Sequence, residues 1–327
     1  MVAYILRSTA QAILVLLAVG LIAFSMFRFV GDPIANMVGQ EASQADRREL
    51  AERLGLNDRV LVQFGRFVRD VAQGEFGVSY RHGRKVSDLL MERLPATVEL
   101  AVLSALLAVV AGTILGVYTA IRRDGWLSHL IMTTSLVGVS LPTFLIGIGL
   151  IYLFAVELRW LPSFGRGQTV KIGWWTTGLL TESGRKSLIM PVVTLAFYQL
   201  TLIMRLVRAQ MLETLRTDYI KFARARGLPE RRIHFKHALR NTLIPVVTIA
   251  GLQLGSVIAF AIVTESVFQW PGLGALFVQA VQFVDIPVMA TYLLFVAVVF
   301  VVVNFIVDLL YFVLDPRLRT GRALATG

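Results

Sequence analysis

Three carboxylates interrupt otherwise apolar stretches of this 327-residue chain: Glu99, Glu265 and Asp308. An ionisable group at membrane depth is costly, so it often marks an ion or proton pathway. Each of the three stands close enough to the end of its apolar run to reach water. We therefore expect interfacial side chains at these positions rather than a chain of groups that moves ions.

Motifs for nucleotide or metal chemistry do not accompany these carboxylates in the sequence. It contains neither G-x-x-x-x-G-K-[ST], the phosphate-binding loop, nor H-E-x-x-H. It contains no cysteine, which excludes disulfides and thiolate metal sites. His234 and His237 are spaced i, i+3, but a metal site there would lack acidic or cysteine ligands. We therefore expect both histidines to be exposed helix residues. The sequence therefore predicts no ATP site, no metal site and no cofactor.

The densest charge lies in a basic segment between two apolar runs. Residues 205–240 hold ten Lys/Arg and three Asp/Glu, so they carry seven of the eleven net positive charges. Within the segment, Asp218 can cap a short helix and Gly227 can end it with a left-handed turn. Pro229 then suits the first turn of a second helix.

The short helix also has an apolar edge, made by Tyr219, Phe222, Ala223 and Leu228. Exposed aromatic side chains on a short helix that ends at a glycine turn are suited to docking into a cleft on a partner protein. The alternative is a helix that lies on anionic lipid at the membrane surface. Nucleic acid is disfavoured as a partner, although the pI is near 10.4, because the positive charge is confined to loops between apolar runs.

The elements that position this segment are membrane spans. The chain is 56% hydrophobic and 16% charged, with a mean hydropathy of +0.69, whereas soluble domains carry about 25% charged residues. A span needs roughly 20 apolar residues and must be helical to satisfy its backbone. Six windows qualify: approximately Ala10–Val30, Val98–Ile121, Ile131–Val156, Leu188–Val207, Leu243–Phe268 and Val288–Leu314. The first is expected to be a retained span, since it lacks the cleavage site of a signal peptide.

The distribution of basic residues predicts the orientation. The loops and tails on the side of both termini hold sixteen Lys/Arg, against five in the short loops on the other side. Short loops rich in Lys/Arg stay in the cytoplasm, so both termini and the basic segment are expected there. All five tryptophans lie near span ends, as in an aromatic belt: Trp126, Trp160, Trp174, Trp175 and Trp270.

Several segments, in order, resemble one family of membrane proteins. Ala223-Arg-Ala-Arg-Gly227 and Lys236-His-Ala-Leu-Arg-Asn-Thr-Leu-Ile-Pro245 resemble the ATPase-contacting EAA loop of binding-protein-dependent ABC importer permeases. The Glu of that pattern is Lys221 here, and its first Ala is Phe222. Pro245 follows Gly227 by 18 positions, a longer spacing than in the general EAA pattern. This longer spacing resembles the form of the loop in the peptide permease subgroup.

The other segments of the resemblance run nearly end to end. They are Gly74-Glu-Phe-Gly-Val-Ser-Tyr80, Arg93-Leu-Pro-Ala-Thr-Val-Glu-Leu100, Ser140-Leu-Pro-Thr-Phe144, Trp160-Leu-Pro-Ser-Phe-Gly165, Glu265-Ser-Val-Phe-Gln-Trp-Pro-Gly-Leu-Gly274, Val307-Asp-Leu-Leu-Tyr311 and Leu314-Asp-Pro-Arg317. Each is weak alone, but their order is specific. Together they most resemble the first, B-type, permease subunit of dipeptide/oligopeptide importers.

The resemblance implies an all-α membrane protein of six transmembrane helices in the bacterial cytoplasmic (inner) membrane. It implies a transport subunit and not an enzyme, paired with a second homologous permease, two cytoplasmic ABC ATPases and a periplasmic or lipid-anchored substrate-binding protein. The expected division is residues 1–30 for the first transmembrane helix, 31–96 for a periplasmic loop with short amphipathic helices, 97–314 for a five-helix core with a coupling loop at 208–241, and 315–327 for a cytoplasmic tail.

Two sets of functional residues are expected, the first implied by the resemblance and the second chosen for its polarity within the apolar spans. The residues expected to contact the ATPase and to transmit its movement, called the ATPase-coupling residues, are Tyr219, Phe222, Ala223, Arg224, Ala225, Gly227 and Leu228. Polar residues in the spans are candidates for lining the pathway: Ser140, Thr143, Gln253 and Ser256. The alternative is that Ser and Thr in the spans serve helix packing, the role also open to Gly112-x-x-x-Gly116 and Gly251-x-x-x-Gly255. Relatives carry dipeptides, oligopeptides, glutathione, nickel chelates or sugars, so the substrate stays open.

The long loop 31–96 is expected to be structured. Gln44–Leu54 has a helical pattern, and Asn57 can cap a helix over Asp58–Ala72. A solvated pair of surface helices is the simpler interpretation, and a shelf near the binding protein is the functional one. A stand-alone secondary carrier or channel remains the alternative to the importer, although such carriers usually have more spans and a charge pair at mid-membrane depth.

Overall fold

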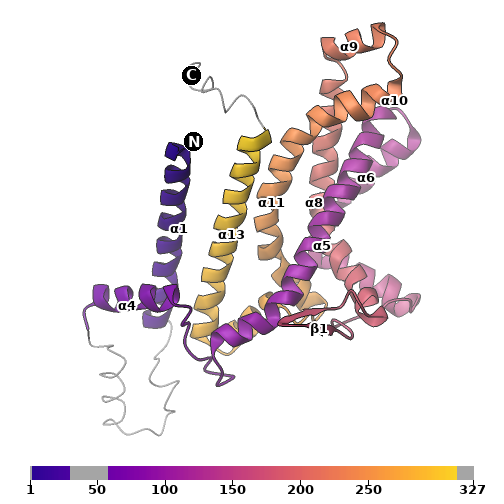
Figure 1. Ribbon diagram of the computed structural model, residues 1–327. Helices are drawn as coiled ribbons and strands as arrows, with labels where there is room; N and C mark the ends of the chain where they lie inside the picture. The colour runs from indigo at the N-terminus through magenta and orange to yellow at the C-terminus, as the bar shows by residue number, and fades with distance from the viewer. Residues whose placement is uncertain (1, 30–57, 315–327) are drawn as a thin grey trace. The chain divides into compact units, whose positions relative to one another are not determined.

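The computed structural model describes residues 2–29 and 58–314, and most of them are helical (Figure 1). Four helices are long and apolar enough to cross a membrane: α1 (Val2–Phe29), α5 (Val86–Ile121), α8 (Glu182–Thr214) and α13 (Ile286–Leu314). The pair α6 (Trp126–Ser140) and α7 (Thr143–Leu150), continued by the π-helical η1 (Ile151–Glu157), makes a fifth if it counts as one span. The structure thus contains four or five candidate spans among its described residues, against the six predicted.

The predicted span Ile131–Val156 is not one straight helix. It breaks after Ser140, and the two segments differ in direction by 113°. Pro142 explains the break, because proline cannot donate a backbone hydrogen bond and disfavours helical geometry in the residue before it. The chain resumes as α7 with Pro142 in an extended conformation (φ −56°, ψ 138°).

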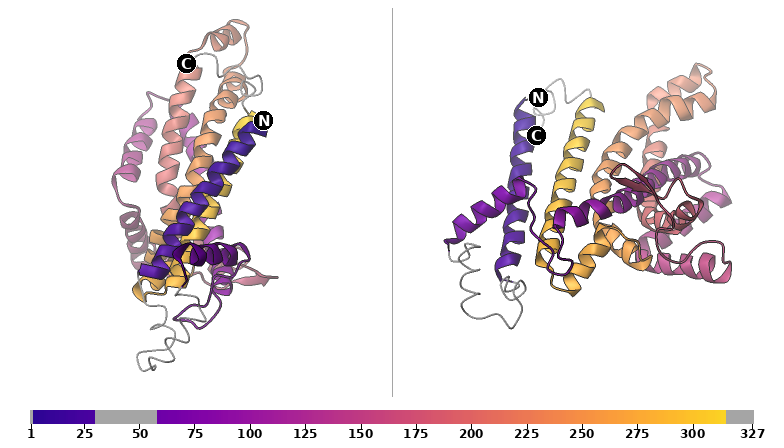
Figure 2. Two further views of the ribbon diagram at one scale, coloured as in Figure 1. Left: turned by 90° about the vertical axis from the view of Figure 1, so that its left-hand side faces the viewer. Right: turned by 60° about the horizontal axis from the view of Figure 1, so that its bottom comes forward.

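The chain folds as two compact units. Unit 1 comprises residues 1–95 and 271–301, and unit 2 comprises residues 96–270 and 302–327. In unit 1, α4 (Val60–Ala72) runs crosswise to α1 (Figure 2). Phe24 of α1 meets Phe64 and Phe67 of α4 at centroid distances of 5.5 and 5.9 Å, and Ala23 packs with Ala290 and Leu294 of α13. This aromatic seam anchors α4 to α1.

The start of α4 differs from the sequence prediction. The helix begins at Val60 with Arg59 at its N-cap position, two residues later than predicted. Asp58 lies outside the helix, where its carboxylate pairs with Arg66 and its carbonyl accepts from Gln63 at 2.8 Å. Asn57 and the predicted helix Gln44–Leu54 lie outside the described residues.

A buried aspartate organises the other end of unit 1. Asp285, which is 1% exposed, lies between α12 (Leu273–Gln282) and α13. Its carboxylate accepts hydrogen bonds from the Ser79 hydroxyl at 2.5 Å and from the backbone N–H of Tyr80 at 3.1 Å. Burial, and then the charge of Asp285, raise the pKa of Tyr80 to about 12. The loop before α5 is therefore fastened to the α12–α13 corner.

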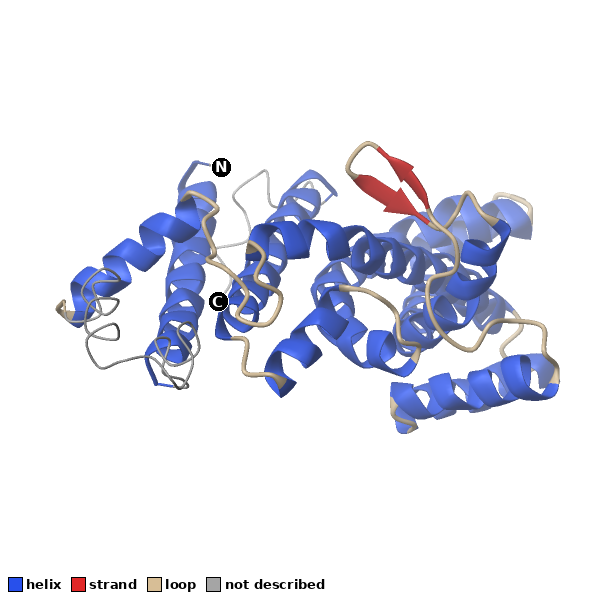
Figure 3. Cartoon of the chain, turned by 90° about the horizontal axis from the view of Figure 1, so that it is seen from below, coloured by secondary structure: helices blue, strands red, loops and turns tan. Residues whose placement is uncertain are grey.

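Unit 2 is a helical bundle with a small hairpin. Its remaining elements are β1 (Val170–Ile172), β2 (Trp175–Thr177), α9 (Asp218–Ala225), α10 (Glu230–Arg232), the π-helical η2 (Ile233–Ala238) and α11 (Leu239–Val267). The two strands pair antiparallel, with Val170 opposite Thr177 (red in Figure 3). Figure 1 places α9 and this hairpin at opposite ends of unit 2. We call these the α9 end and the hairpin end.

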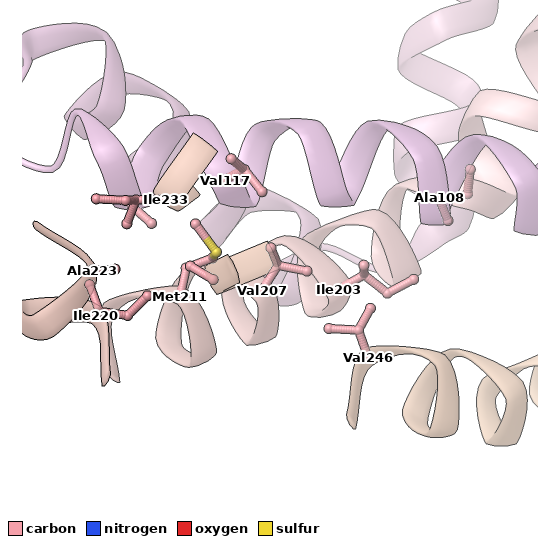
Figure 4. Packing of buried hydrophobic residues seen from close by; sticks show 12 residues of the cluster. Ala108, Val117, Ile203, Val207, Met211, Ile220, Ala223, Ile233 and Val246 are labelled. Carbon is pink, nitrogen blue, oxygen red and sulfur yellow. The ribbon is translucent and has the colours of Figure 1, made fainter. Parts of the chain in front are cut away.

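Two apolar clusters hold the two ends. At the α9 end, Val117 of α5 and Met211 of α8 pack with Ile220, Ile233 and their neighbours (Figure 4). At the hairpin end, Leu100 of α5 and Leu188 of α8 pack with Trp270. Residue numbers rise from the hairpin end to the α9 end along both α5 and α8, so these two helices run parallel. α11 returns in the opposite direction.

Glycine allows α5 to approach α8 closely. A Cβ atom added at Gly116 would lie 2.6 Å from Cβ of Val207 and 2.7 Å from the carbonyl oxygen of Met204. One added at Gly112 would lie 3.0 Å from Ile203. Gly112-x-x-x-Gly116 therefore serves helix packing, as small residues do between membrane helices.

Candidate functional site

The short helix α9 is anchored through one face. Ile220 is fully buried and Ala223 is 8% exposed, and both belong to the apolar cluster at the α9 end. Leu228, just after the helix, packs against the same cluster. Two of the predicted ATPase-coupling residues, Ala223 and Leu228, therefore face the interior of the protein. Ile220, which the sequence analysis missed, is recognisable from its i, i+3 spacing with Ala223.

The opposite face of α9 is exposed and aromatic. Phe222 is 63% exposed and Tyr219 is 42% exposed. The Tyr219 hydroxyl accepts a hydrogen bond from the Asn241 side chain at 2.8 Å, which ties α9 to α11. Arg224 and Ala225 are also exposed. Burying an exposed phenylalanine on a partner is favourable by about 1.5–3 kcal/mol, so this face is suited to docking.

The turn after α9 is a Schellman motif. Gly227 has φ +75°, as the sequence predicts. The N–H of Leu228 donates to the carbonyl of Ala223 at 3.3 Å, and the N–H of Gly227 donates to that of Arg224 at 2.8 Å. These two bonds and the apolar contact of Leu228 define the motif. The turn thus fixes the direction in which the chain leaves α9.

The start of α9 is not capped as predicted. Thr217 holds the N-cap position without a side-chain cap bond, and Asp218 is the first helical residue. The Asp218 carboxylate instead accepts from Lys221 at 2.8 Å. This hydrogen bond, and then the charge of Lys221, lower the pKa of Asp218. The i, i+3 pair competes with capping because both need the same carboxylate.

A second charged group braces the turn. Arg224 donates to both oxygens of Glu230, at 2.8 and 3.3 Å, and this hydrogen bonding lowers the pKa of the Glu230 carboxyl. His234 lies 3.2 Å from the same carboxylate. His234 is therefore half-buried with an acidic neighbour, and not the isolated, exposed residue that the sequence suggested. Pro229 takes the N-cap position of α10, directly before the first turn in which it was predicted.

A pocket of about 490 Å³ opens at the break between α6 and α7. Its walls come from the break itself, from α8 and from α11: Val139, Ser140, Leu141, Pro142, Thr143, Phe144, Leu195, Tyr198, Gln199, Phe260 and Val263. Ser140 and Thr143, two of the predicted pathway residues, both line it. Tyr198 and Gln199 lie at the middle of α8. The sequence analysis missed these two.

The other two pathway candidates lie on α11. Gln253 is half-buried, and its backbone oxygen accepts a hydrogen bond from the Gln199 side chain at 3.3 Å. Position 256 belongs to the same helix, but its side chain lies outside the described part of the structure. The structure therefore brings Ser140 and Thr143 together at one pocket and places Gln253 next to a residue of its wall.

Two of the three carboxylates singled out in the sequence, Glu99 and Glu265, are buried within the protein and do not reach water, which corrects the sequence expectation. Glu99 is 6% exposed and Glu265 is fully buried. Glu99 pairs with Arg166 at 2.6 Å and accepts from the Thr177 hydroxyl at 2.7 Å, while Glu265 accepts from the Thr97 hydroxyl at 2.6 Å. A carboxylate with such partners can be buried far from water. The side chain of Asp308 lies outside the described part.

Arg166 and Trp270 complete this cluster at the hairpin end. The Arg166 guanidinium also donates to the backbone oxygen of Thr176 at 2.7 Å. It lies 5.9 Å from the Trp270 ring centroid. Trp270 is fully buried and donates to the Ala96 carbonyl at 3.0 Å, so this tryptophan is not part of an exposed belt. The polar contacts hold the hairpin against α5.

The family follows from comparison with known proteins. Residues 112–320 match the family described as binding-protein-dependent transport system inner membrane component, and residues 1–101 match the N-terminal segment of such membrane components. The chain belongs to this family. It is thus a membrane-spanning permease subunit, and ATP hydrolysis resides in other subunits of such importers.

The similarity of this permease to curated relatives runs nearly end to end. It is 37% identical to the dipeptide transport system permease protein DppB of Alkalihalophilus pseudofirmus, covering 98% of this chain and all of the relative. It is 39% identical to the oligopeptide transport system permease protein AppB of Bacillus subtilis, with the same coverage. The predicted resemblance to dipeptide/oligopeptide permeases is confirmed.

The permease fold is also found in a solved structure. A chain of the MetNI methionine ABC transporter, in an inward-facing conformation, aligns with a TM-score of 0.55 at 20% identity. The alignment covers 69% of this permease and 96% of that chain. At this level of identity the match supports the shared fold.

Proposed function

We propose that this permease forms half of the translocation pathway of an ATP-driven importer of di- or oligopeptides. The observation that carries the proposal is the similarity, over nearly the full length of the chain, to permeases named for dipeptide and oligopeptide transport. Its proposed partners are a second homologous permease, two cytoplasmic ATPases and a substrate-binding protein outside the membrane. The test is uptake by the chain alone and by the assembled system, with uptake expected only from the complete assembly supplied with ATP.

The proposed topology has six crossings, made by α1, α5, the bent α6–α7–η1 segment, α8, α11 and α13. α11 is the additional crossing, since its 29 residues exceed the roughly 20 that a span requires. Both termini and the α9 end of unit 2 lie in the cytoplasm. The hairpin end and the loop 31–96 lie outside, residues 97–314 form the core with its coupling loop at 208–241, and residues 315–327 form a cytoplasmic tail.

We propose that α9 is the contact with the ATPase. Tyr219, Phe222, Arg224 and Ala225 form its exposed face, while Ala223, Gly227 and Leu228 hold its direction. Because Ile220 and Ala223 pack with α5 and α8, a displacement of α9 is transmitted to both helices. ATP-driven closure of the ATPases would move the α9 ends of the two permeases together and open the pathway outward.

Cysteine accessibility tests the orientation, since the sequence contains no native cysteine. Arg231→Cys suits the test because Arg231 is exposed in α10, while its neighbour Glu230 is paired. Lys171→Cys, exposed in β1 at the hairpin end, is the matched control. An impermeant maleimide applied to spheroplasts is expected to label the Lys171→Cys variant at once, and the Arg231→Cys variant only after permeabilisation. The reverse pattern would refute the orientation.

We propose that the pocket at the α6–α7 break belongs to the pathway. Backbone that leaves helical geometry at membrane depth is tolerated where it is buried in protein or lines a water-filled cavity. Ser140 and Thr143 lie at such a break and line the pocket. Gln253, Ser256 and Phe260 are spaced i, i+3 and i+7, so they share a face of α11, and Phe260 lines the same pocket. Gln253 and Ser256 are accordingly proposed as further lining residues.

A further inference from the structure

We propose that the pocket at the α6–α7 break binds short peptides through their backbone and does not discriminate by side-chain charge. The proposal rests on the proposed function, and it adds the feature of the substrate that this site recognises. Its volume of about 490 Å³ lies within the range of roughly 300–1,000 Å³ found for small-ligand sites. That size suits a short peptide segment in extended form.

The chemistry of the pocket walls is neutral. All residues that the structure places around it are uncharged, and its polar side chains are Ser140, Thr143, Tyr198 and Gln199. Hydroxyls and a carboxamide both donate and accept hydrogen bonds. They therefore match the N–H and C=O groups that every peptide carries. The remaining walls are apolar, so a charged substrate side chain would find no fixed partner among them.

Gln199 is the polar residue of the pocket whose position best suits hydrogen bonding to a peptide backbone. It is 5% exposed although its carboxamide is polar, and it lies at the centre of α8 on the pocket wall. Its Nε2 donates to the backbone oxygen of Gln253 at 3.3 Å. A primary amide has two N–H groups and an acceptor oxygen, so the bond to Gln253 leaves capacity for a ligand.

The broken backbone adds partial charges on both sides of the pocket. The last carbonyls of α6 and the first N–H groups of α7 lack intrahelical partners, as at any helix end. They carry partial negative and positive charge, respectively. Pro142 supplies no side-chain cap to α7. These ends complement the ammonium and carboxylate termini of a short peptide without favouring either sign of side chain.

Substrate protection of a single cysteine tests the site. Thr143→Cys lines the pocket, and Leu153→Cys, exposed on η1 outside the lining, is the matched control. The assembled importer would be labelled with a small maleimide during turnover, with alanyl-alanine, alanyl-glutamate or alanyl-lysine supplied at saturating occupancy of the binding protein. We expect all three peptides to slow modification of the Thr143→Cys variant at least about threefold by mass action, and to leave that of the Leu153→Cys variant unchanged. An ester analogue without the peptide N–H should protect less.

Charge introduced at the same position gives a second, independent readout. Thr143→Asp should favour alanyl-lysine over alanyl-glutamate, and Thr143→Lys the reverse, each by about tenfold in relative uptake, because a nearby charge acts strongly in a partly desolvated site. Wild-type uptake should lie between the two.

The possible failures separate the site from the function. If the Thr143→Cys importer moves peptide normally while its cysteine is not protected, this site is overturned and the proposed function still stands. Protection confined to one charge class would also overturn the site. If the assembled wild-type system imports no peptide, both proposals fail.

Discussion

Replacing Arg166 with methionine is expected to destabilise the permease by about 3–5 kcal/mol, the cost of leaving one member of a buried ion pair without its partner. Arg166 and Glu99 lie 2.6 Å apart, with side chains that are 8% and 3% exposed. The substitution also removes the bonds from Arg166 to Thr176 that hold the hairpin. Thermal unfolding of the purified protein in detergent or nanodiscs, compared with wild type, measures the loss.

Two further variants identify the cause of that loss. Glu99→Gln combined with Arg166→Met removes both charges, so much of the lost stability should return, since the glutamine can still bond to Thr177. Lys171→Met, on the exposed face of the same hairpin, is the matched control and should change stability by at most about 0.5 kcal/mol. An Arg166→Met protein that unfolds at the same temperature as wild type would contradict the role given to this pair. So would a double variant that is less stable than the single one.

Gly227→Val is expected to lower peptide uptake to near background while the protein still inserts into the membrane. Gly227 has φ +75°, where a side chain costs on the order of 1–2 kcal/mol, and more if it is β-branched. A Cβ atom there would meet nothing within 4 Å, so the effect is on the backbone turn and not on packing. A changed turn breaks the bonds from Gly227 and Leu228 and misdirects α9. Uptake, membrane abundance and co-purification of the ATPases would be measured together.

Gly227→Asn is the matched control for this substitution. Asparagine adopts the left-handed conformation far more readily than valine, so the turn should persist and uptake should stay within a few-fold of wild type. Equal uptake by the two variants, at equal abundance, would show that the conformation of this turn has no part in coupling.

The sequence predicted those features that depend on local pattern. The left-handed conformation of Gly227 follows from a glycine at the end of a short amphipathic helix, and the close packing of Gly112 and Gly116 follows from their spacing. The family resemblance, which the similarity to known permeases confirms, could be predicted because it rests on many ordered segments. The division of α9 into a buried and an exposed face was missed. The i, i+3 spacing of Ile220 and Ala223 indicates a shared face, but its burial depends on where Val207 and Met211 of α8 lie.

Features that depend on contacts between distant segments could not be predicted. Glu99 is buried because Arg166 and Thr177, 67 and 78 residues later, fold back onto it. Asp285 is held by Ser79, 206 residues earlier. The break after Ser140 had a local signal in Leu141-Pro142, but the pocket that it opens also needs Gln199 and Phe260 from two other helices. Hydropathy alone identified the apolar window and not its bend.

Reconstituted uptake tests the central proposal most directly. The chain alone, and then the chain with its partner permease, ATPases and binding protein, would be placed in liposomes, and uptake of a labelled dipeptide followed with and without ATP. The sequence has no nucleotide-binding loop, so we predict no uptake by the chain alone and ATP-dependent uptake by the complete assembly. Uptake by the chain alone, or uptake that ignores ATP and follows a proton or sodium gradient, would contradict the importer and favour a secondary carrier.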